Sequence, residues 1–177
     1  MFNLAQGTKV LSGKWPTGPT GMPPTWNAPV QFDGSLVAWL TAQHGELNAR
    51  FASLAGQLDK DPETAERAVR ECASRLHDLR RTEALRLYPV IACWFGPDPD
   101  AQRLASQSRL IMMGLVRRVL RLFDDLVHAI RNGAEIPAAA DRVATALTEY
   151  RRRNEGEMYP MYNLMQRLSV PAQSRLA

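Results

Sequence analysis

The chain has 177 residues and a formal net charge of +4 at pH 7, with 45% hydrophobic and 23% charged residues. This length suits one domain that buries roughly 70% of its unfolded surface, and the composition is that of a globular protein. No window approaches the ~18 consecutive apolar residues of a membrane span, and the N-terminus lacks a charged region followed by an apolar run. We therefore expect no membrane segment, no secretory signal, and a cytoplasmic, bacterial-type protein.

The positive charge comes mainly from arginine, which forms short runs at residues 80–81, 117–118 and 151–153. Such runs can make a basic patch for nucleic acid or an acidic partner. Because acidic residues sit beside them, we interpret the runs as solvated helix faces and do not expect nucleic acid as the partner.

The sequence holds two cysteines, Cys72 and Cys93, which fall on one predicted helix. At ~1.5 Å rise per residue they lie roughly 30 Å apart, which is too far for a disulfide. We expect buried free thiols, as a reducing compartment allows, with an intermolecular bridge as the alternative.

Residues 1–32 differ from everything after them, since five of the twelve prolines and four glycines fall there. Such a segment cannot continue as a helix or a central strand. Trp15, Met22, Trp26 and Phe32 give it apolar anchors. We predict an extended arm that packs along the rest of the protein, or onto a second copy or another protein partner.

Four helical stretches follow, with apolar residues at three- and four-residue steps. The predicted ranges are 33–58, 62–94, 100–131 and 137–168. Asp33 is the expected N-cap of the first, Pro62 suits the first turn of the second, and Gly133 follows the third as its C-cap. The predicted core stripe continues through Val90 and Trp94 on the second helix and through Met161, Leu164 and Leu168 on the fourth.

Helices of this length with short loops predict an all-α fold, an antiparallel up-down-up-down four-helix bundle over residues 33–168. Residues 169–177 remain as a C-terminal tail. Pro89 and Pro160 lie inside the second and fourth helices, where each removes a backbone hydrogen bond and should kink its helix.

Several polar residues fall on the predicted core stripes: His44, Glu83, Ser108 (between Leu104 and Ile111), Tyr150 and Asn154. These side chains could meet in one layer of the core. A buried ionisable group costs several kcal/mol unless it is paired or bound to metal, so His44 and Glu83 indicate a linked pair. Of the other histidines, His77 flanks the stripe, and His128 is expected to be exposed.

A repeated signal accompanies these residues. The segments Thr82-Glu83-Ala84-Leu85-Arg86-Leu87-Tyr88-Pro89 and Arg153-Asn154-Glu155-Gly156-Glu157-Met158-Tyr159-Pro160 both place Tyr-Pro after a core-facing polar residue. With His44 on the first helix, this pattern resembles the hemerythrin-like (HHE cation-binding) family over roughly residues 33–168. The resemblance implies a four-helix bundle with a di-iron centre, which binds oxygen or acts in iron, oxygen, nitric oxide or redox sensing.

Carried over by position, His44 matches the first-helix iron ligand and Glu83 the bridging carboxylate of the second helix. The His expected before Glu83 is Leu79, with His77 two residues earlier. On the fourth helix the expected His and carboxylate are Tyr150 and Asn154, with Glu155 adjacent. The candidate metal ligands are therefore His44, His77, Glu83, Tyr150 and Glu155.

We predict from this set a non-enzymatic regulatory or interaction protein whose di-iron site is largely lost, so that the cofactor is none or non-haem iron. The alternative is a metal or oxygen sensor with one iron or zinc, which requires a distortion of the second helix near Leu79 that turns His77 inward. A third hypothesis is a haem or apolar-ligand pocket lined by Met112, Met113, Met158, Met161 and Met165. No catalytic triad, phosphate loop or strong zinc motif supports an enzyme.

Overall fold

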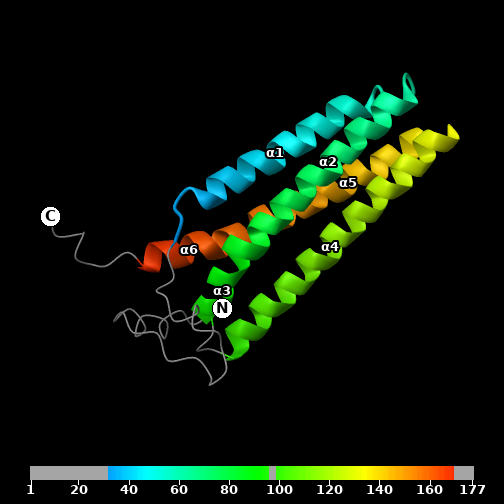
Figure 1. The fold of residues 1–177 in the computed structure, drawn as a ribbon. Helices are drawn as coiled ribbons and strands as arrows, with labels where there is room; N and C mark the ends of the chain where they lie inside the picture. The colour runs from blue at the N-terminus through cyan, green and yellow to red at the C-terminus, as the bar shows by residue number, and fades with distance from the viewer. Residues whose placement is uncertain (1–31, 96–98, 170–177) are drawn as a thin grey trace.

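The computed structural model describes residues 32–95 and 99–169, in which helices are joined by short turns and no strand occurs (Figure 1). The predicted arm lies outside the described residues except for Phe32, and so does the tail beyond Ser169. The helices are α1 (Leu36–Ala55), α2 (Pro62–Thr82), α3 (Tyr88–Phe95), α4 (Pro99–Asn132), α5 (Ile136–Arg153) and α6 (Tyr159–Ser169). Two five-residue π-helical turns, η3 (Glu83–Leu87) and η4 (Asn154–Met158), join α2 to α3 and α5 to α6.

In the described ranges these elements form four rods: α1, α2-η3-α3, α4, and α5-η4-α6. The α1 helix packs on α2 and α5, and α4 packs on the same two helices. Figure 1 shows the rods side by side, with the α1–α2 and α4–α5 turns at the same end of the molecule. None of the helices in the described ranges combines the length and the apolar character needed to cross a membrane.

The helix ends follow the local sequence, with two corrections. Asp61 accepts hydrogen bonds from the backbone of Glu63 and Thr64 at 3.2 and 3.4 Å, and Pro62 occupies the first turn as predicted. Asp33, predicted as the N-cap of the first helix, instead accepts from the backbone and hydroxyl of Ser35. That turn delays the helix to Leu36, and the helix ends at Ala55 rather than Leu58.

The π-helical turns occupy the matching places in the second and fourth rods. In η3 the Tyr88 N–H donates to the Glu83 carbonyl, and in η4 the Tyr159 N–H donates to the Asn154 carbonyl, each across five residues. Proline follows each tyrosine, and its ring would clash with the carbonyl four residues back in a regular α-helix. A widened turn before the proline relieves that clash, so each expected kink takes the form of a π-helical turn.

Each π-helical turn shifts the core stripe after it, which corrects part of the predicted core. After η3 the buried residues are Tyr88 and Ile91, whereas Val90 and Trp94 are only partly buried. After η4 they are Tyr159, Tyr162 and Met165, while the predicted Leu164 is 43% exposed and Met161 is partly buried. The physical reason is the extra residue in the turn, because 3.6-residue periodicity does not continue in phase across it.

The core divides into an apolar half and a polar half. Near the α1–α2 and α4–α5 turns it is purely apolar, with Phe51 against Phe123 in an edge-on contact at 5.6 Å between ring centroids. In the half that holds the π-helical turns, His44, Glu83, Ser108 and Asn154 are all buried, as predicted. The line through Ser108 is Ala105–Ser108–Met112, and the predicted neighbours Leu104 and Ile111 are exposed.

Candidate functional site

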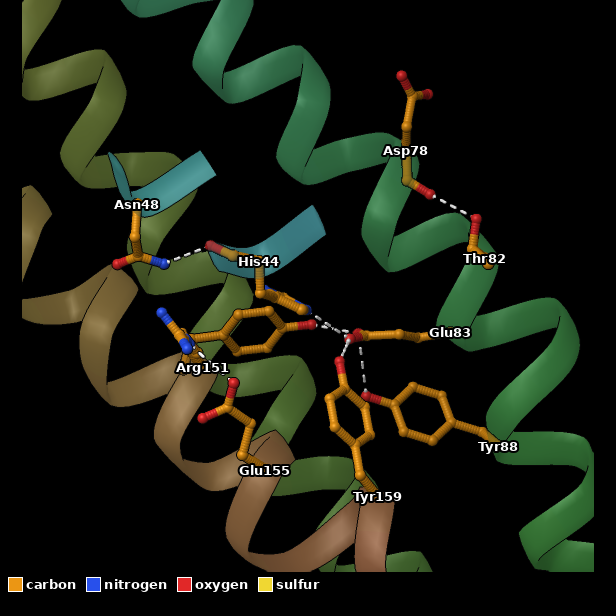
Figure 2. A network of polar contacts seen from close by, with 10 residues as sticks. His44, Asn48, Asp78, Thr82, Glu83, Tyr88, Arg151, Glu155 and Tyr159 are labelled. Carbon is orange, nitrogen blue, oxygen red and sulfur yellow. Dashed lines mark hydrogen bonds and ion pairs between the residues drawn. The ribbon is translucent and has the colours of Figure 1, made fainter. Parts of the chain in front are cut away.

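A buried carboxylate, Glu83, is the centre of the polar half. Its side chain has no exposed surface, and one oxygen, Oε1, lies 3.0 Å from His44 Nε2 and accepts from the Tyr159 hydroxyl at 3.2 Å. The other oxygen, Oε2, accepts from the Tyr150 hydroxyl in a short hydrogen bond and from the Tyr88 hydroxyl at 3.5 Å. Figure 2 shows His44, Tyr88 and Tyr159 converging on Glu83.

The contact between His44 and Glu83 depends on which ring nitrogen of His44 carries the proton. An ionised carboxylate only accepts hydrogen bonds and offers about four lone-pair sites, and three hydroxyl donors already approach these oxygens. The contact from His44 is then favourable when Nε2 carries the proton and donates to Oε1. In that arrangement all four groups around Glu83 act as donors, and each carboxylate oxygen has two partners although the side chain is buried.

The π-helical turn explains how Tyr88 reaches Glu83. In a regular α-helix, five residues turn through about 500°, so residue i+5 points about 140° away from residue i. The i→i+5 hydrogen bond of η3 widens the turn and brings Tyr88 onto the face of Glu83. In the same way η4 brings Tyr159 into the core on the face of Asn154.

The side chain of His44 is held from several directions. Its ring lies against the rings of Tyr150 and Tyr159, with centroids 5.4 and 6.3 Å away. Its backbone carbonyl accepts a hydrogen bond of 2.9 Å from the Asn48 side chain. With 1% of its surface exposed, His44 is buried in the core and its ring is fixed by these contacts.

The surroundings keep the tyrosines protonated. Burial, and next the negative charge of Glu83, raise the pKa of Tyr88, Tyr150 and Tyr159 above the usual phenol value. Burial also raises the pKa of Tyr162, whose hydroxyl accepts from the Asp33 backbone N–H at 2.9 Å. These four are all the tyrosines of the chain, so every phenol of the protein is tuned in the same direction.

Asn154 differs from its counterpart Glu83. The amide is completely buried, yet neither its oxygen nor its nitrogen makes a hydrogen bond of normal geometry to the described residues. It lies close enough to the Tyr150 hydroxyl to lower the pKa of that phenol slightly, against the larger effect of burial. Both amide atoms are therefore buried without a hydrogen-bond partner among the described residues.

The structure brings together only some of the predicted ligands. His44, Glu83 and Tyr150 meet, whereas Glu155 forms an ion pair with Arg151 at 2.8 Å, away from the cluster (Figure 2). His77 is exposed and lines a hollow of about 290 Å³ on the outer face of α2 and α4. The helix around Leu79 is a regular α-helix, so the distortion that would turn His77 inward is absent from that stretch. His128 is exposed, as expected.

The residues of the cluster do not fit a di-iron centre. Such a centre needs several imidazoles and bridging carboxylates, but the cluster holds one of each. In residues 32–95 and 99–169, no three His, Cys, Asp or Glu side chains are grouped so that they could hold a metal ion. What the arrangement can do chemically is hold a buried negative charge with four donors and keep three phenols protonated.

The methionine-lined pocket has little room. A hollow beside the cluster, lined in part by Met112 and Met113, has a volume of about 70 Å³. Ligand pockets usually hold roughly 300 Å³ or more, so this hollow suits a few small atoms rather than a haem. Met112, Met158 and Met165 are buried core residues.

Both cysteines are free thiols, Cys72 buried and Cys93 half-buried. Burial raises the pKa of both thiols, which favours the unreactive protonated form.

Sequence reasoning missed Tyr88 and Tyr159 as partners of Glu83. Both belong to the Tyr-Pro segments, but a regular helix would turn each tyrosine away from the predicted core stripe. The available signal was a tyrosine five residues after a core-facing polar residue and directly before proline.

Comparison of the sequence with protein-family models found no matching family, and comparisons with curated proteins and with solved structures found no significant match.

Proposed function

We propose that this chain is a hemerythrin-like antiparallel up-down-up-down four-helix bundle with a non-enzymatic, regulatory or interaction role. In this proposal the cluster around Glu83 occupies the place of a di-iron site, and its hydrogen bonds take over the structural work of metal ligation. The His44, Glu83 and paired Tyr-Pro positions support the family assignment. An interaction through residues 1–32 with a second copy or another protein is part of the same proposal.

One observation carries the proposal: both oxygens of Glu83 are already occupied by donors. A metal ion bound to this carboxylate would displace at least one hydroxyl or the imidazole from it. The three close donors, His44, Tyr150 and Tyr159, are buried, and each would lose its partner on displacement, at a cost of about 1–3 kcal/mol. The network therefore competes with a metal ion instead of preparing a site for it.

The test is the iron and zinc content of the purified full chain, before and after anaerobic loading with Fe(II), with an absorption spectrum in air. We expect no stoichiometric metal and no colour. Two irons per chain with an oxo-bridge absorption band would overturn the proposal.

A second candidate, an atypical metal or oxygen sensor, is favoured by the unpaired amide of Asn154. A buried amide oxygen without a hydrogen bond could accept one from a water or contact a cation. This candidate expects one metal per chain, lost in the His44→Ala variant. The same loading experiment separates it from the first proposal.

A further inference from the structure

The hollow of about 70 Å³ beside the cluster has a distinct chemical lining. It lies against α2, η3, α3, α4 and α5, and its walls are Arg80, Ala84, Tyr88, Arg109, Met112, Met113, Val116 and Tyr150. Two arginines and two phenols are its polar residues, and no carboxylate lines it. The lining is thus rich in hydrogen-bond donors, since guanidinium groups only donate and phenols held protonated can donate.

The two arginines are not used elsewhere in the described ranges. Neither Arg80 nor Arg109 makes an ion pair with any carboxylate of residues 32–95 and 99–169, although eleven other pairs form there. Arg109 instead lies over the Tyr88 ring, with its guanidinium carbon 5.9 Å from the ring centroid. Arg80 is half-buried, on the last turns of α2 just before η3. Arg109 is exposed, but it lines the same small hollow as Arg80, and two guanidinium groups brought together in this way can pair with one anion.

A donor is also available on the inner wall. The Tyr88 hydroxyl has the longest of the four contacts to Glu83, at 3.5 Å, which is the weak limit of a hydrogen bond. Glu83 keeps the stronger contacts from His44, Tyr150 and Tyr159 if Tyr88 turns away. Tyr88 can therefore donate to a guest in the hollow at little cost to the cluster.

The volume selects the size of the guest. A cavity needs about 10–15 Å³ on this measure for each water it holds, so about 70 Å³ accommodates several atoms of water size. A single oxyanion of four or five heavy atoms fits that room. The hollow is too small to enclose a nucleotide or a haem.

We propose that this hollow binds one small free oxyanion, of the nitrate or inorganic phosphate class, between the Arg80 and Arg109 guanidinium groups and the Tyr88 hydroxyl. The inference rests on the proposed regulatory function and deepens it by naming a ligand class. An anion here joins α2 to α4 beside the Glu83 cluster, so its binding is coupled to the packing of the α2-η3-α3 rod against α4.

The test is isothermal titration of the full chain with sodium nitrate and, separately, with inorganic phosphate, in a constant sodium chloride background. We expect saturable binding of one ion per chain. Arg80→Gln and Arg109→Gln should each weaken the binding about tenfold, and the double variant should abolish it. Tyr88→Phe should weaken it less, because it removes a neutral donor.

Arg117→Gln is the matched control. Arg117 is an exposed arginine on the same helix as Arg109, and it makes no ion pair within the described ranges. Its binding should equal that of the wild type. Arg109→Lys, which keeps the charge but loses the planar fork, should bind with intermediate affinity and guards against a folding defect in the glutamine variants.

Non-saturable binding, or an equal loss in Arg117→Gln, would overturn the anion site. Much tighter binding of O-phosphoserine than of inorganic phosphate would also overturn it, because the ligand would then be a phosphorylated chain instead of a free ion. Metal analysis of the same preparation keeps the two proposals apart. A metal-free protein that binds no oxyanion fails only here, whereas a protein with two irons fails the proposed function.

Discussion

The two π-helical turns share one backbone device and carry opposite polar chemistry. In η3 the core-facing Glu83 is a charged group whose oxygens are all occupied. In η4 the core-facing Asn154 is a neutral amide with both polar atoms unpaired. The Tyr-Pro segment therefore sets the π-helical turn, whereas the stabilising effect of the buried polar group depends on the hydrogen-bond donors that other helices place around it. Glu83 is the centre of a hydrogen-bonded cluster, whereas Asn154 has no hydrogen-bond partner among the described residues.

The largest effect is expected when the Glu83 carboxylate is removed. In Glu83→Ala, His44 and the Tyr150 hydroxyl lose their common acceptor while remaining buried. Breaking a buried pair by deleting one partner costs about 3–5 kcal/mol, a large fraction of the ~5–15 kcal/mol by which a domain is stable. Urea denaturation followed by circular dichroism should show the midpoint falling steeply.

Two further variants serve as controls for Glu83→Ala. Glu83→Gln keeps the shape and one acceptor oxygen, so it should lose less stability than Glu83→Ala but still more than a surface change. Glu71→Gln, which removes an exposed carboxylate paired with Arg50, should behave as an ordinary surface substitution. If Glu83→Ala were as stable as Glu71→Gln, the cluster would have no structural role.

The second prediction concerns high pH. The four tyrosines have raised pKa values in the folded state, whereas unfolded phenols ionise near pH ~10. Above that pH the unfolded state releases protons that the folded state retains, so the free energy of unfolding decreases as pH rises. The contribution is fully present below pH ~10 and is lost as pH climbs toward the folded values. Tyrosinate absorbance should therefore appear in one cooperative step that coincides with loss of helical circular dichroism.

The same titration in guanidinium chloride provides the reference, where all four phenols should ionise near pH ~10. A folded protein that shows gradual phenol ionisation near pH ~10, with its helices intact, would contradict the buried positions of these tyrosines.

The third prediction ranks the hydroxyl groups around Glu83. Tyr150 makes the short hydrogen bond and is 1% exposed, whereas Tyr88 contacts the carboxylate only at 3.5 Å. Tyr150→Phe should cost about 1–3 kcal/mol of stability, and Tyr88→Phe less than about 1 kcal/mol. Equal losses in denaturation experiments would show that the two hydroxyls stabilise the cluster equally and would contradict this ranking.

The sequence allowed much of the fold to be predicted, for reasons visible in particular residues. Proline and glycine mark the helix ends at Pro62 and Gly133. The apolar residues at three- and four-residue steps predict the four helical rods. His44, Glu83, Tyr150 and Asn154 were predicted in the core because regular helices precede each of them.

The predictions became wrong beyond the two π-helical turns. Periodicity assumes a constant residue number per turn, and an i→i+5 hydrogen bond breaks that assumption without a strong compositional sign. A constant period consequently places Leu164 in the core and turns Tyr88 and Tyr159 away from it, whereas the structure exposes Leu164 and buries both tyrosines. The hollow between Arg80 and Arg109 could not be foreseen either, since it depends on how α2 and α4 pack.

Substitution of Asn154, the buried amide of η4 that has no hydrogen-bond partner, is expected to have the smallest effect. Asn154→Leu replaces a completely buried amide by an apolar side chain of similar size, and so removes two polar atoms that have no partner. Exchanging unsatisfied polar atoms for apolar ones is neutral or stabilising, so the free energy of unfolding should stay within about 1 kcal/mol of the wild type or rise. A clear loss of stability would mean that the amide has a partner in solution, such as a buried water or a cation. Metal analysis of the wild-type protein would then decide between them, because a water leaves no metal and the atypical sensor would carry one metal per chain.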